Sequence, residues 1–160
     1  MSAHASAPPA PPVAPLACTL EGPAKLRAGE PARFTLKLHN RGSQAVQLLN
    51  WATPFEPAWF APWLTVQRDG RPLPYGGAKM KRGDPEASHY VAIAAGASAS
   101  ASFELAPAFD VSTPGRYTLR PRIVLHDLLP GSTQTVPRPL AQHQPHRLRC
   151  NDLRFEITSP

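Results

Sequence analysis

The sequence predicts an all-β fold, an antiparallel β-sandwich of seven to nine short strands, the number typical of this architecture. The chain has 160 residues and 42% hydrophobic content, enough for one buried core. Its 21 prolines and 10 glycines interrupt the chain so often that long helices are disfavoured. Between these breaks, apolar and polar residues alternate in short runs, the pattern of half-buried strands.

The strand predictions follow this alternation along the chain. In residues 31–39, Phe34, Leu36 and Leu38 fall on one face and polar side chains on the other. Asn40 to Ser43 then form a turn, and Asp69-Gly70 signals a hairpin turn after residues 64–67. The remaining strands are predicted at 45–51, 90–93, 101–105, 117–125 and 153–157.

Tyr117 narrows the architecture further. It follows Pro114-Gly115 at the start of the penultimate predicted strand. In immunoglobulin-like sandwiches a tyrosine at this place donates its hydroxyl to the preceding loop and joins two strands. We therefore predict an immunoglobulin-like sandwich with Tyr117 in a structural role.

The chain divides into a tail and one domain. Residues 1–15 are rich in alanine and proline and predict a disordered tail, whereas residues 16–160 form the sandwich domain. Two gaps interrupt the strand spacing, residues 52–63 and 126–149, and long loops of this kind usually carry function or are disordered.

The net charge of +6 comes from cations scattered along the sequence. No basic run is longer than Lys81-Arg82, and no nucleic-acid-binding motif occurs. The sequence therefore favours a solvated basic surface over a nucleic-acid partner.

Cys18 and Cys150 lie near opposite ends of the predicted domain, and neither has the closely spaced partner of a zinc or redox site. A disulfide between them would close a loop over most of the chain, worth up to about 5 kcal/mol, and would indicate an oxidising compartment. Two buried thiols in a cytosolic protein are the alternative.

Residues 1–17 lack the charged and apolar regions of a signal peptide, and no segment has the length and hydrophobicity of a membrane span. We expect a periplasmic or secreted protein whose leader is not visible here, with no membrane span.

Several short motifs follow one another in a fixed order between Glu21 and Arg120. They are Thr53-Pro54-Phe55-Glu56, Asp69-Gly70, Pro74-Tyr75 with Gly77, Lys81-Arg82-Gly83-Asp84-Pro85, and Gly96-Ala97-Ser98. This order resembles the N-terminal, propeptide-like domain of bacterial deuterolysin-type (aspzincin) zinc peptidases, including the peptidyl-lysine metalloendopeptidases.

The catalytic motifs of these peptidases are missing. None of the six histidines is followed by glutamate, so no His-Glu-x-x-His motif occurs, and no Gly-Thr pair occurs either. Gly96-Ala97-Ser98 lacks the second glycine of a nucleophile elbow. We expect a stand-alone relative of the non-catalytic domain, not an enzyme, with no cofactor or metal.

The resemblance implies a protein-interaction module, a propeptide-like or proteinase-inhibitor-like partner of a peptidase, such as a zinc metallopeptidase. The oligomeric state is left open. Trp51 is expected in the core, whereas Trp59 and Phe60 are equally compatible with a lid and with a contact surface. The candidate contact residues are Phe55, Glu56, Trp59, Phe60, Lys79, Lys81 and Arg82.

The sequence leaves two alternative functions open. The aromatic loop is also compatible with stacking on a carbohydrate or another ligand. His126, Asp127, His143 and His146 contain the donor types of a zinc or copper site, but Pro145 prevents a regular helix there, so solvated loop histidines are the favoured interpretation.

Overall fold

The computed structural model describes residues 15–131 and 135–160 and shows an all-β, immunoglobulin-like sandwich. Of the predicted tail, only Pro15 lies within the described residues, and its carbonyl accepts a hydrogen bond from Arg41 N at 2.8 Å. No helix in the described ranges is long and apolar enough to cross a membrane.

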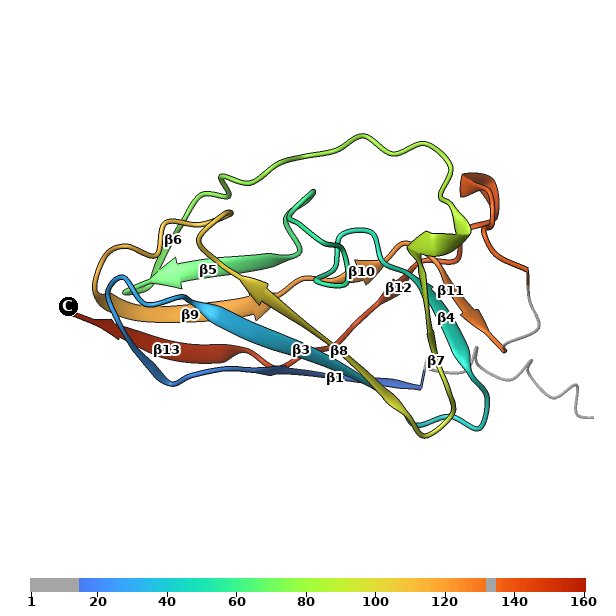
Figure 1. Cartoon of the computed structure of the whole chain (residues 1–160), viewed down its shortest axis with the longest axis horizontal. Helices are drawn as coiled ribbons and strands as arrows, with labels where there is room; N and C mark the ends of the chain where they lie inside the picture. The colour runs from blue at the N-terminus through green and yellow to red at the C-terminus, as the bar shows by residue number, and fades with distance from the viewer. Residues whose placement is uncertain (1–14, 132–134) are drawn as a thin grey trace, which may run out of the picture.

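One layer is a three-stranded sheet in the order β1-β3-β8, comprising β1 (Leu16–Glu21), β3 (Arg33–Asn40) and β8 (Ser98–Glu104). The other is a five-stranded sheet in the order β2-β13-β9-β5-β6. Its members are β2 (Lys25–Arg27), β13 (Leu153–Thr158), β9 (Gly115–Pro121), β5 (Leu64–Arg68) and β6 (Arg71–Pro72). Most of these strands run along the long axis of the molecule (Figure 1).

Smaller elements complete one end of the molecule. A second three-stranded sheet has the order β11-β4-β7, and β10 pairs with β12 in a two-stranded ribbon (Figure 1). Their bounds are β4 (Val46–Leu49), β7 (Tyr90–Ile93), β10 (Val124–Leu125), β11 (Leu128–Pro130) and β12 (His146–Arg147). Two short 3-10 helices, η1 (Ala87–His89) and η2 (Leu140–Gln142), lie in the connections.

The core fills the space between the two main sheets because alternate residues of each strand point inward. Phe34 of β3 meets Phe155 of β13 with ring centroids 4.9 Å apart, and Phe155 stacks on Tyr117 of β9 at 5.0 Å. The Tyr117 hydroxyl donates to the Thr113 carbonyl at 2.5 Å, four residues upstream, as the sequence predicts for this corner.

The hairpin between β5 and β6 follows the turn chemistry of its sequence. Asp69 and Gly70 have φ angles of 51° and 79°, the left-handed conformation that an Asp-Gly turn requires. Asp69 also joins the hairpin to β9, because its Oδ1 accepts from Arg116 N at 3.0 Å. Pro72, which lacks an amide proton, is the last residue of β6.

The strand count exceeds the prediction through one six-residue edge strand and several strands of two or three residues. The described residues contain thirteen strands, of which eight have four or more residues. β1 and β2 were not predicted, since β1 is a half-buried edge strand and β2 has only three residues. The strand predicted over 117–125 ends at Pro121, and Val124–Leu125 pairs instead with His146–Arg147, inside the segment predicted as a loop.

The predicted disulfide between Cys18 and Cys150 is present, with a sequence separation of 132 residues. It links β1 to the segment before β13, where the side chain of Asn151 accepts from Leu20 N and donates to Leu20 O at 2.8 and 3.0 Å. The bond thus joins the two layers covalently.

We expect the Cys18→Ala/Cys150→Ala variant to lose about 4–5 kcal/mol of unfolding free energy, because the loop closed by the bond is long. Chemical denaturation measures this loss. Adding a reductant should destabilise the native protein to a similar degree and leave the double variant unchanged. Equal stability of the native protein and the double variant would contradict a structural role for the bond.

Candidate functional site

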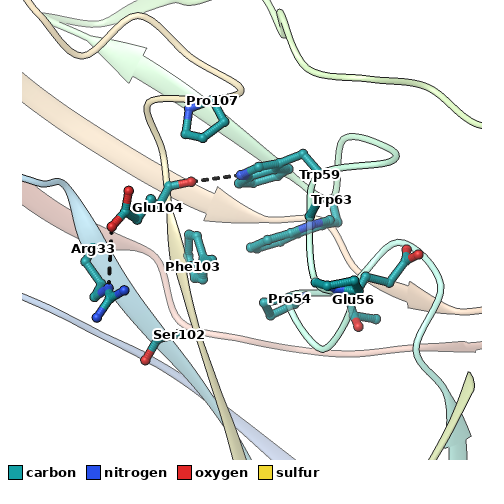
Figure 2. A pocket seen from close by; sticks show the side chains of 12 residues that line it. Arg33, Pro54, Glu56, Trp59, Trp63, Ser102, Phe103, Glu104 and Pro107 are labelled. Carbon is teal, nitrogen blue, oxygen red and sulfur yellow. Dashed lines mark hydrogen bonds and ion pairs between the residues drawn. The ribbon is translucent and has the colours of Figure 1, made fainter. Parts of the chain in front are cut away.

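The loop from Trp51 to Trp63, called the lid here, packs against the open side of the sandwich. Trp59 and Trp63 stack with centroids 4.3 Å apart and an interplanar angle of 4°. Both rings meet Phe103 of β8 edge-on, at 5.9 and 4.6 Å. Trp59 Nε1 donates to the Glu104 carbonyl at 2.8 Å, as Figure 2 shows.

Trp59 is 8% exposed and closes the sandwich as part of the lid. Its role in contact with a partner stays a prediction. Trp51, expected in the core, is 3% exposed. Phe55 and Phe60 are half-buried.

A shallow groove of about 290 Å³ lies between the lid and β8. Trp59, Trp63 and Phe103 form its apolar wall, and Arg33 and Glu104, an exposed ion pair at 3.6 Å, stand at its edge (Figure 2).

The carboxylate of Glu56 is the polar centre of the lid. It is buried, and its two oxygens accept from Arg82 Nη2 at 2.7 and 2.6 Å. Oε1 also accepts from Ala52 N at 2.6 Å. Hydrogen bonding of this kind offsets the cost of removing a carboxylate from water. Glu56 and Arg82, proposed from the sequence as contact residues, therefore bind each other.

The Arg82 guanidinium also packs on aromatic rings. Its central carbon lies 5.0 Å from the Trp51 ring centroid and 5.5 Å from that of Phe60. Cation–π contacts at these distances add to the ion pair.

Arg82 belongs to a long irregular segment, residues 73–86, called the strap here, which arches across the top of Figure 1 between β6 and η1. Hydrogen bonds to separate parts of the domain hold it. Gly76 N donates to Ala108 O at 2.7 Å and Met80 N to Phe60 O at 2.9 Å. Asp84 Oδ1 accepts from Leu140 N at 3.2 Å.

Between these anchors the strap presents Lys79, Met80 and Lys81 to solvent. Met80 is 49% exposed, one of three large apolar side chains with substantial exposure in the described parts of the chain. The two lysines have no ion-pair partner among the residues that the structure describes. The strap thus exposes two cations and one large apolar side chain next to the lid.

Three histidines surround the Trp51 ring. The ring centroids of His89, His126 and His143 lie 6.4, 5.9 and 6.0 Å from it. Partial burial lowers the pKa of His126, and the nearby charges of Arg82 and His143 lower it further, against an opposing effect of Glu56. Burial also lowers the pKa of His146.

A second buried carboxylate, Asp127, holds the segment predicted as the loop 126–149. It accepts from Tyr90 Oη at 2.8 Å, from Gln144 N at 2.8 Å, and from Nε and Nη2 of Arg138. Although burial alone raises the pKa of Asp127, these hydrogen bonds outweigh it and lower the pKa. Burial, together with the bond to Asp127, raises the pKa of Tyr90 to about 12.

The sequence analysis missed this network. Asp127 was considered only as a metal ligand beside His126, and Arg138 was not singled out. Within the described ranges, no three or more His, Cys, Asp or Glu side chains are grouped closely enough to hold a metal ion. The acid in this segment instead forms an ion pair.

No protein-family model matches the chain. The chain is 38% identical over 88 residues to an extracellular protease of Aeromonas hydrophila, a match that covers 55% of this chain and 25% of that protein. The chain thus spans about a quarter of the length of this curated relative.

The solved structures that the chain matches are distant from it in sequence and overlap with it only partly. The native conformation of Escherichia coli alpha-2-macroglobulin is 12% identical, with a TM-score of 0.41, covering 91% of this chain and 7% of that one. The CARDB domain of the PF1109 protein from Pyrococcus furiosus, in complex with di-metal ions, is 11% identical, with a TM-score of 0.37, covering 91% and 94%.

The protein is therefore a β-sandwich domain related to part of an extracellular protease. The disulfide and this relative are both consistent with export. The more specific assignment to a deuterolysin-type propeptide domain stays a prediction.

We expect Arg82→Met to lower the free energy of unfolding by about 3 kcal/mol, because it leaves the buried Glu56 carboxylate without its cation. The control is Lys81→Met, an exposed neighbour, which should change stability by less than about 0.5 kcal/mol. The Glu56→Gln/Arg82→Met double variant should lose less than the sum of the single variants. Additive losses would show that the pair is not coupled.

We expect the unfolding temperature to fall as the pH drops from about 7 to 5. His126 and His146 have lowered pKa values in the folded state, whereas in the unfolded chain they titrate near 6.5. Below that pH the unfolded chain binds more protons, so stability decreases. Asp127, with its lowered pKa, extends the loss below about pH 4.

Thermal unfolding of a His126→Gln/His146→Gln variant checks this assignment. Its unfolding temperature should change less between pH 7 and 5 than that of the native protein or of a His39→Gln control. An unchanged pH slope in the double variant would remove these two histidines from the explanation.

Proposed function

We propose that this domain is a non-catalytic, exported protein-interaction module that associates with a peptidase in a propeptide-like or proteinase-inhibitor-like manner, and that the strap is its contact segment. The relationship to part of an extracellular protease supports the class of partner. The observation that carries the choice of segment is the exposed Lys79-Met80-Lys81 sequence between fixed anchors.

The anchors favour binding because they hold the strap before a partner arrives. Met80 N is bonded to the lid, and Arg82 is paired with buried Glu56 two residues later. A segment ordered in advance loses less conformational entropy on association. The strap therefore combines an irregular backbone with restricted motion.

The side chains of the strap suit a protein surface. Met80 offers a flexible apolar group that adapts to a pocket, and the flanking lysines attract an acidic rim and increase the association rate. This assignment replaces Trp59 and Glu56 as contact residues, because both are buried in the domain.

A carbohydrate-binding role receives less support. Trp51, Trp59 and Trp63 are 3%, 8% and 3% exposed, so none of them presents an open ring face to a sugar.

The described residues contain one hydrogen bond between a hydroxyl and an imidazole, and its surroundings support a non-catalytic role. Ser98 Oγ lies 2.7 Å from His39 Nδ1, but the two residues are cross-strand neighbours on the exposed face of β8 and β3. Among the residues that the structure describes, no carboxylate contacts His39 to orient it as a base, which a nucleophilic site requires. We interpret the pair as a surface contact of the sheet.

We expect the purified domain to bind the Aeromonas hydrophila extracellular protease, used as the probe, and to slow its hydrolysis of a fluorogenic peptide. Replacing Lys79, Met80 and Lys81 together by serine should weaken binding at least about tenfold, since the apolar anchor and its charges are lost. Biolayer interferometry and inhibition assays measure both effects.

The matched control replaces Lys37, Arg41 and Leu140 by serine, again two exposed cations and one exposed apolar residue. This variant should bind like the native domain. Equal weakening in both triple variants would contradict the strap as the contact segment, and the absence of association and of inhibition would contradict the proposed function. Peptide hydrolysis by the domain alone would contradict its non-catalytic role.

A further inference from the structure

The fold gathers cations that are scattered in the sequence onto one outer face. In the five-stranded sheet, Tyr117, Leu119 and Phe155 point inward, so the alternate residues of β9 and β13 point outward. The strand pairing places β2 beside β13 and β13 beside β9. The outward cations are Lys25, Arg27, Arg116, Arg120 and Arg154.

The basic face continues onto the ribbon of β10 and β12. Val124 pairs with Arg147, and Leu148 N donates to Ile123 O at 2.9 Å, which extends the same register to Arg122 opposite Arg149. Ile123 and Leu148 are buried, so Arg122, Val124, Arg147 and Arg149 share the outer side. Arg122 and Arg149 are like charges directly opposite each other in an antiparallel pair, an arrangement that is destabilising, and Arg147 adds a third positive charge beside them.

These side chains surround a groove of about 340 Å³, called the ribbon groove here. It is lined by Arg122, Arg147 and Arg149, together with 40%-exposed Val124 and with Cys150 of the disulfide. Arg122 also lines a neighbouring groove that contains Arg120 of β9.

The arginines of the ribbon groove lack acidic partners. Elsewhere the domain neutralises Arg33, Arg82, Arg120 and Arg138 with carboxylates within 4.0 Å. For the three arginines of the groove, no such carboxylate exists among residues 15–131 and 135–160. Within the described part of the chain, their side chains make one hydrogen bond, from Arg122 Nη1 to the carbonyl of Pro121 at 3.2 Å.

We propose that the ribbon groove is a docking site for an extended acidic segment, rich in Asp or Glu, of a protein partner. Guanidinium groups bind carboxylates through paired hydrogen bonds, and three unneutralised arginines complement two or more carboxylates of one segment. Val124 supplies an apolar contact between them. The site rests on the proposed function only in its assumption that the domain acts by protein contact.

A protein segment fits this surface better than a nucleic acid. The ribbon groove has no aromatic side chain on which a base would stack. Glu156, paired in register with both Arg116 and Lys25, interrupts the positive charge on the adjoining sheet, where a continuous phosphate backbone would meet it.

Fluorescence anisotropy with a labelled hexaglutamate peptide tests the site, with hexaglutamine as the uncharged comparison. We expect the native domain to bind hexaglutamate, with affinity falling as salt is raised, and not hexaglutamine. Arg147→Glu/Arg149→Glu should weaken binding at least about tenfold, because it reverses two of the three charges at the groove.

The matched control is Lys37→Glu/Arg41→Glu, which changes the net charge equally on exposed residues of another part of the surface. It should change binding less than about twofold. Arg147→Lys/Arg149→Lys keeps the charge without the planar guanidinium and should give an intermediate loss. A near-UV circular dichroism spectrum identifies any variant that does not fold, and the lysine variant then carries the test.

Two results would overturn the site: equal losses in the reversal variant and in its control, or tighter binding of a short DNA duplex than of hexaglutamate through the same arginines. The outcome is separable from that of the strap. Hexaglutamate binding without any association with the protease supports the ribbon groove and contradicts the proposed function. Protease association without hexaglutamate binding supports the proposed function and contradicts the ribbon groove as a docking site.

Discussion

The arrangement of lid and strap depends on the hydrogen bonds that the buried carboxylate of Glu56 accepts. It accepts from Ala52 within its own loop and from Arg82, 26 residues further along the chain. A carboxylate removed from water is costly unless its oxygens are bonded, so the lid and the strap are stable in this position only together. The exposed part of the strap is thus fixed by a contact that lies entirely inside the domain.

Asp127 performs the same task for the segment after β10, and the two networks meet at Trp51. Arg82, which belongs to the Glu56 network, lies over the Trp51 ring. His126 and His143 are the sequence neighbours of Asp127 and of its partner Gln144, and both meet the same ring edge-on. Long connections without regular structure expose backbone groups that need partners. Here two buried acids and one shared tryptophan supply these partners and fixed points.

Local chemistry was enough to predict the strands with clear alternation, the Asp69-Gly70 turn, the Tyr117 hydroxyl bond and the pairing of Cys18 with Cys150. Each depends on residues close in sequence or on a pair with no competitor. The partner of Glu56 was not predictable in this way, because nothing in the pattern of residues 52–63 indicates which of 17 cations reaches it. The basic face was missed for a related reason: Lys25, Arg116 and Arg154 become neighbours only through the strand order β2-β13-β9, which periodicity does not encode.

The disulfide lies beside the ribbon groove, where it contributes to the stability of the paired strands β10 and β12. β10 and β12 each contain two residues, too few to hold an isolated pair together. Arg147 of β12 and the flanking Arg122 and Arg149 line one groove and repel one another. Cys150 directly follows Arg149 and is bonded to Cys18 of β1. The covalent link therefore holds the end of the ribbon against the sandwich where charge repulsion opposes pairing. A surface arranged for an acidic partner is in this way maintained by a bond that oxidising compartments favour.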